Sequence, residues 1–108
     1  MSLYLARAKY SPEAFKAMIA NPSDREVAAR VMFEAAGVKL HHIWYSNNGE
    51  AITIFEGDLV ARSMVGMVVM ASGGFTSTEV TELITMNQMT DAMKGAGAVA
   101  AKFRPPGK

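Results

Sequence analysis

The residues best suited to chemistry cluster in one short segment, which reads LHHIWY from position 40 to 45. It holds both histidines of the chain, and a histidine can act as a general base or as a haem ligand near neutral pH. Alternation along a strand predicts two faces, Leu40, His42 and Trp44 on one and His41, Ile43 and Tyr45 on the other. Two histidines on opposite faces cannot bind one metal ion. The more ordinary alternative is a hydrogen-bonded or solvated histidine at a sheet edge or interface.

A second candidate is the pair of cations Arg7 and Lys9, which alternation places on one face of the first strand with Leu3 and Leu5. Such a pair could hold an anionic ligand. The alternative is solvation near the strand end, or an ion pair with Glu50, Glu79 or Glu82. Glu79 and Glu82 are three positions apart, so a regular strand points them to opposite faces and they form no paired-carboxylate site.

The remaining candidates are weaker. The chain has nine methionines and no cysteine, so thiol catalysis and thiolate metal sites are excluded. Methionines at helical spacing are far more often core or interface residues than a copper site. Gly73 and Gly74 follow a helical pattern, whereas a phosphate-binding loop precedes a helix. We therefore predict no metal and no cofactor.

Composition sets broad limits on function. The chain has 108 residues, a formal net charge of +1 and a hydrophobic fraction of 50%, which is typical of one globular domain. Its basic residues are scattered, so we expect no nucleic-acid partner. The apolar run from Met64 to Ala71 is too short to span a membrane, and the N-terminus lacks a signal-peptide pattern. We expect a cytoplasmic protein.

The elements that position these residues follow from pattern and turn signals. We predict strands at 3–10, 38–45, 51–56 and 75–85, with helices at 12–19, 24–36, 59–72 and 86–94. The two early helices could also form one kinked helix. Asn47, Asn48 and Gly49 predict a tight hairpin. We assign residues 1–94 to one domain and 95–108 to a loosely held tail.

This order predicts a ferredoxin-like α+β fold, with βαββαβ topology plus a C-terminal helix and a four-stranded antiparallel sheet. Helices cover one face of such a sheet. The other face must expose large apolar side chains on either choice of alternation, so we expect sheet-to-sheet pairing in a homodimer or higher homo-oligomer.

The helix predicted at 59–72 is apolar almost all round, because Arg62 is its one charged residue. A helical wheel assigns one arc to the sheet, comprising Val60, Met64, Met67, Val68 and Ala71. The apolar surplus then lies on the outer arc. Either the C-terminal tail covers that arc or dimers associate further through it.

Several short motifs in this order resemble the GYD-domain family: Lys9–Glu13 (KYSPE), Asp24-Arg25 with Ala28-Ala29, Gly37–Leu40 (GVKL), Ala71–Gly73 (ASG), and Thr78-Glu79 before Leu83–Thr85 (LIT). The resemblance implies the dimeric α+β barrel form of the ferredoxin-like fold. Where relatives carry Gly-Tyr-Asp at the hairpin, this chain has Asn48-Gly49-Glu50, in which Glu50 can replace the acidic residue but nothing replaces the tyrosine.

No catalytic signature follows from these patterns, and fold alone does not give function. We expect an oligomeric protein that binds a small apolar or aromatic ligand in the barrel, through Arg7, His42, Trp44 and Thr53. One alternative is a cofactor-independent monooxygenase-like or isomerase-like enzyme, with His42 or His41 as base and Trp44 shaping the pocket. Another is a purely structural assembly subunit.

Overall fold

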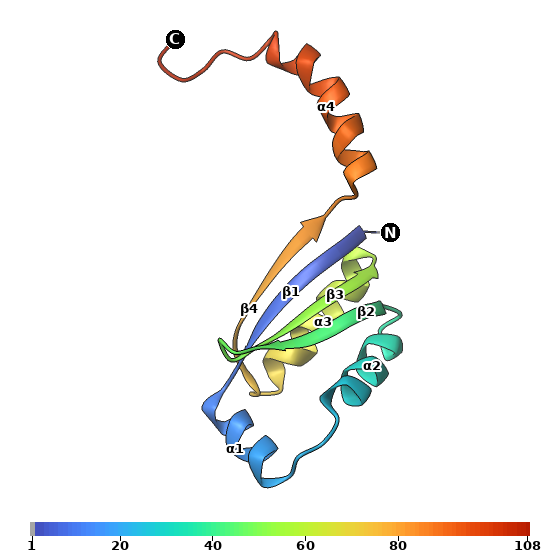
Figure 1. Cartoon of the computed structure of the whole chain (residues 1–108), viewed down its shortest axis with the longest axis vertical. Coiled ribbons are helices and arrows are strands. Elements are labelled where there is room, and N and C mark those ends of the chain that lie inside the picture. Colours follow the sequence, from blue (N-terminus) through green and yellow to red (C-terminus); the bar gives the residue numbers. More distant parts are fainter. Residues whose placement is uncertain (1) are drawn as a thin grey trace.

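A computed structural model describes residues 2–108, and it has a four-stranded antiparallel sheet flanked by helices (Figure 1). The elements in chain order are β1 (Ser2–Tyr10), α1 (Pro12–Ala20), α2 (Arg25–Ala35), β2 (Lys39–Ser46), β3 (Glu50–Gly57), α3 (Leu59–Ala71), β4 (Phe75–Leu83) and α4 (Met86–Ala100). The strand order is β2-β3-β1-β4. The predicted ferredoxin-like α+β fold is confirmed.

Each helix starts at a polar cap that the sequence supplies. The side chains of Ser11, Asp24, Asp58 and Thr85 each accept a hydrogen bond from a backbone N–H two or three residues further on. Gly49 closes the β2–β3 hairpin with φ = 85°, a conformation that favours glycine. The turn at Asn21–Ser23 separates α1 from α2 as two helices.

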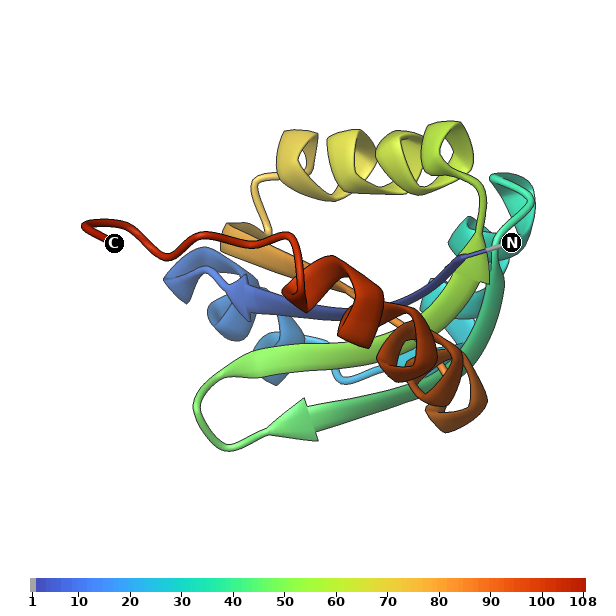
Figure 2. The ribbon, with the colours of Figure 1, turned by 90° about the horizontal axis from the view of Figure 1, so that it is seen from above.

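The sheet has one face toward the helices and one face open. Tyr4, Leu40 and Phe55 are buried on the helix side, where they pack with Phe33 of α2 and Val65 of α3. Tyr4 and Phe55 stack with ring centroids 5.4 Å apart. Figure 2 shows α3 lying lengthwise over this face. The apolar core therefore occupies one side of the sheet.

A bulge in β2 corrects the predicted alternation. Leu40 pairs with Phe55, but the next paired residue is His42, which lies opposite Ile54. His41 is the extra residue of the bulge. Leu40 consequently faces the helices, while His42 and Trp44 face the open side. The prediction that Leu40 shares their face was wrong, because strict alternation fails at one inserted residue.

Helix α3 uses a different face from the one predicted. Ala61 and Val65 are its buried residues, and Val69 is partly buried against the core. Val60 and Met64 are exposed, so assigning them to the sheet was wrong. Met67 and Val68 are exposed as well, but they border the space between α3 and the sheet. A helix without a polar face has no hydropathy contrast to fix its rotation, and the small Ala61 allows close approach to the sheet.

Helix α4 projects past the end of the sheet (Figure 1) and has no buried residue. It ends at Ala100, beyond the predicted end at Lys94, and it includes Gly95 and Gly97. It does not cover α3. None of the helices in the described part of the chain combines the length and hydrophobicity that crossing a membrane requires.

Candidate functional site

A cavity of about 690 Å³ lies between the helices and the middle of the sheet. Helix α2 contacts β2 at one edge of the sheet, and α3 contacts β4 at the other edge. The central strands β1 and β3 therefore lie beneath the space between the two helices. The cavity therefore follows from the topology, which leaves the centre of the sheet uncovered between the two helices.

Small side chains form the floor of this cavity. Ala6 pairs with Thr53 across β1 and β3, and Ala8 pairs with Ala51. All four of these residues line the cavity. Because none of them is larger than threonine, they leave unfilled the volume that leucine or phenylalanine would occupy in a close-packed core.

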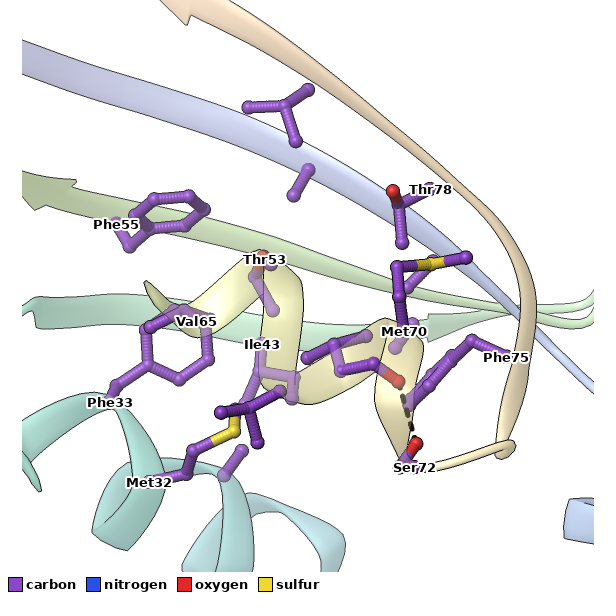
Figure 3. Close-up of a pocket in the computed structure, with 18 of the residues that line it drawn as sticks. Met32, Phe33, Ile43, Thr53, Phe55, Val65, Met70, Ser72, Phe75 and Thr78 are labelled. Atoms are coloured by element: carbon purple, nitrogen blue, oxygen red, sulfur yellow. Dashed lines mark hydrogen bonds between the residues drawn. The ribbon is translucent and has the colours of Figure 1, made fainter. Parts of the chain in front are cut away.

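The walls are largely apolar and come from both helices (Figure 3). Met32 and Phe33 of α2 face Val65 and Met70 of α3 across the cavity, while Phe75 and Thr78 of β4 close one side. Ligand sites are commonly apolar concavities of about 300–1,000 Å³ with a few polar groups. This cavity has the size and lining of such a site.

Few groups in the cavity can titrate or donate. Hydroxyl groups come from Thr53, Ser63, Ser72 and Thr78, and the ionisable side chains are those of Tyr10, Arg25 and Arg62. Among the lining residues, all of which belong to the described part of the chain, there is no histidine and no carboxylate. The lining therefore offers neither of the two side-chain types, imidazole and carboxylate, that most often act as general bases.

An aromatic cluster closes one end of the cavity. Tyr10 stacks on Phe75 at 4.9 Å and meets Phe15 edge-on at 5.5 Å between ring centroids. Tyr10 also lines a smaller neighbouring cavity of about 400 Å³, together with Trp44 and Tyr45. The main cavity therefore borders a second aromatic space beside α1.

The structure separates the four ligand residues that the sequence suggested. Thr53 lines the cavity on the helix side. Arg7 and Trp44 lie on the open side, on either side of Ile52, with which both are paired in register. His42 lies next to them, opposite Ile54. Arg7, His42 and Trp44 thus share one face of the sheet, and Thr53 lies on the other.

The open-face residues contact one another or their neighbours on the sheet. The rings of His42 and Trp44 stack with centroids 4.8 Å apart. Arg7 forms an ion pair with Glu50 at 3.3 Å, which is one of the partners expected if Arg7 holds no ligand. His41 lies 3.0 Å from Glu56. Glu50, the residue at the family's acidic position, therefore serves to pair Arg7.

Sequence reasoning missed the cavity itself. Its signal was present in the small residues at alternate positions of two strands, Ala6 and Ala8 in one and Ala51 and Thr53 in the other. Strand cores are usually built from larger β-branched and aromatic residues. A run of alanines on one face of paired strands indicates space above them, once the pairing is known.

With this geometry in place, the comparisons give the family. The model of the GYD domain matches residues 4–93, so this is a protein of the ferredoxin-like α+β class and the chain belongs to the GYD-domain family. The match runs from within β1 to the middle of α4. A search of functionally curated proteins finds no match.

Solved structures confirm the fold. The C-terminal domain of the MgtC protein from Mycobacterium tuberculosis is 11% identical with a TM-score of 0.50, covering 77% of this chain and 88% of that one. A crystal structure of a protein from Agrobacterium tumefaciens is 13% identical with a TM-score of 0.50, covering 78% and 92%. A NIPSNAP domain protein from Burkholderia xenovorans is also similar, at 12% identity and a TM-score of 0.45, covering 79% and 94%. The two structures with a TM-score of 0.50 support the fold, and at these identities they show the fold alone.

Proposed function

We propose that this GYD-domain protein binds a small apolar or aromatic ligand in the cavity between its helices and its sheet. The observation that carries the proposal is the apolar cavity of about 690 Å³ floored by Ala6, Ala8, Ala51 and Thr53. Its size and largely apolar lining are those of small-molecule sites. Binding fits better than catalysis, because the lining offers neither histidine nor carboxylate.

A neutral aromatic compound, 2-naphthol, tests this proposal by thermal denaturation. A ligand at ten times its Kd stabilises the folded state by about 1.4 kcal/mol. For a domain of this length that corresponds to a rise in Tm of roughly 6–11 °C. We expect a saturable rise of this kind, and a Tm independent of 2-naphthol up to its solubility limit would contradict the proposal.

Substitution of the cavity floor locates the binding. Ala8→Leu adds three carbons into the cavity, so we expect the ligand-induced rise in Tm to disappear while the unliganded protein stays folded. Ala35→Leu is the matched control, because Ala35 is exposed on α2 outside the cavity and should leave the rise intact. An equal rise in Ala8→Leu and in the unsubstituted protein would place the ligand elsewhere.

We also propose that the protein is a homodimer formed through the open face of the sheet. That face has an apolar centre, which is made of Leu3, Leu5, Ile52, Ile54 and Trp44. The side chain of Trp44 is 56% exposed. A contiguous exposed apolar face is typical of an interaction surface. A second copy is the favoured occupant because α4, unburied and projecting past the sheet, can pack against it. Light scattering should give twice the 11.6 kDa chain mass.

A further inference from the structure

Arg62 is the charged residue of α3, and it lines the cavity. Its guanidinium lies over the ring of Tyr4, with Cζ 5.0 Å from the ring centroid. Its Nε is buried, and within residues 2–108 it has no hydrogen-bond partner. A buried N–H donor without an acceptor is rare in folded proteins. This donor therefore calls for an explanation.

No protein carboxylate supplies that acceptor. The cavity lining within the described chain contains two arginines and no aspartate or glutamate. Glu82 lies across from Tyr4 in the register, but it is exposed and forms none of the ion pairs found among residues 2–108. The side chains that line the cavity are consequently mostly apolar, and those that carry a charge are positive.

The two arginines occupy different places along the cavity. Arg62 lies over Tyr4, which pairs with Phe55. Arg25 begins α2 and also lines the second cavity with Tyr45 and Ala51, toward the hairpin end of the sheet. Arg25 is exposed, whereas Arg62 is partly buried. Of the two arginines, Arg62 is therefore the one that a ligand within the cavity would contact away from bulk water.

We propose that Arg62 binds the carboxylate of a ligand whose apolar or aromatic body fills the cavity. Guanidinium presents several N–H donors in a planar fork that matches a carboxylate, and it stays charged under all ordinary conditions. Charge-assisted hydrogen bonds of this kind are about twice as strong as neutral ones. The proposal rests on the proposed ligand-binding function and narrows its ligand class to small hydrophobic carboxylic acids.

The experiment compares two ligands that differ mainly in charge, 2-naphthoate and its neutral analogue 2-naphthamide, by calorimetric titration of the full-length protein. We expect the carboxylate to bind at least about tenfold more tightly than the amide. In Arg62→Met we expect that preference to vanish while the affinity for the amide changes by less than about twofold. Arg62→Gln keeps a polar head and should behave in the same way if the methionine variant folds poorly.

Two controls separate the possible outcomes. Arg104→Met removes one positive charge from the exposed C-terminal segment and should preserve the preference for carboxylate. If Arg25→Met abolishes the preference and Arg62→Met does not, the assignment to Arg62 is overturned. Equal affinities for 2-naphthoate and 2-naphthamide in the unsubstituted protein overturn the carboxylate proposal while leaving ligand binding intact. Failure of all the naphthyl compounds, 2-naphthol included, overturns both.

Discussion

At the scale of single residues, Ser11 connects parts of the chain that are far apart in sequence. Its hydroxyl accepts a hydrogen bond from the backbone N–H of Ala14 at 3.1 Å and donates one to the carbonyl of Gly73 at 3.0 Å. Its own backbone N–H donates to the carbonyl of Gly74. One buried side chain thus caps α1 and fixes the α3–β4 connection beside it.

We predict that Ser11→Ala lowers the free energy of unfolding by about 1–2 kcal/mol, since it removes a helix cap and leaves a carbonyl without its donor. Urea denaturation measures this loss. Thr85→Ala removes the cap of α4, which does not pack against the rest of the chain, so its effect should stay below about 0.5 kcal/mol. Equal losses in the two variants would contradict this account of Ser11.

At the scale of elements, the sequence predicted strands and helix starts better than helix faces. Caps and turns are local chemistry, so Ser11-Pro12 and the Asn-Gly hairpin sufficed to place β1, α1 and the β2–β3 turn. The rotation of α3 about its axis depends on which side chains contact the sheet. The sequence of a helix that is apolar all round does not indicate which face that is. The bulge at His41 likewise depends on β3, its partner strand.

The candidate site was predicted less completely than the fold. Thr53 was one of the predicted ligand residues, and it lines a cavity. That cavity exists because α2 and α3 lie over opposite edges of the sheet, which local sequence patterns do not show. Arg62 was seen as the one charge on an apolar helix, and only the structure places it over Tyr4. Arg7, His42 and Trp44 lie together on the open face, which is not the face with the cavity.

Helix α4 has few tertiary contacts to stabilise it in the isolated subunit, since it has no buried residue. A helix of 15 residues is marginal in water without tertiary contacts, and this one contains two glycines. We predict that its amides in Met86–Ala100 are protected from hydrogen exchange at high protein concentration and lose protection on dilution below the Kd of the proposed dimer. Protection that does not depend on concentration would mean that α4 does not depend on a second copy.

At the scale of the whole molecule, the single chain is far from compact. Its radius of gyration is 18.1 Å, whereas a compact chain of about 100 residues has about 13 Å. The difference comes from α4 and the segment after it, which extend along the long axis (Figure 1). Such a shape is typical of a subunit whose missing contacts are supplied by an assembly.

We predict that Leu5→Glu converts the proposed dimer to a monomer in light scattering, because it places a charge in the centre of the open face opposite Ile54. Met67→Glu is the control, since Met67 is 72% exposed on α3, which packs on the opposite face of the sheet. It should preserve the dimer and disrupt only higher association. A dimer that survives Leu5→Glu and dissociates with Met67→Glu would reverse the assignment of the interface.

The bulge in β2 has a consequence for how the chain tolerates changes in length. Removing one of the two adjacent histidines leaves Leu40, one histidine, Ile43 and Trp44 in regular alternation, so every remaining side chain keeps its face. The loss is the His41–Glu56 contact, which is partly exposed and worth at most about 1 kcal/mol. We predict that the variant lacking one histidine unfolds cooperatively, with a Tm within several degrees of that of the full chain. Deletion of Thr53 from β3, which has no bulge, moves Ile54 and Phe55 to the opposite faces of the sheet, so we expect that variant to lose cooperative folding. Position 41 is accordingly a place inside a strand where homologous sequences can lack one residue while their core residues keep their positions.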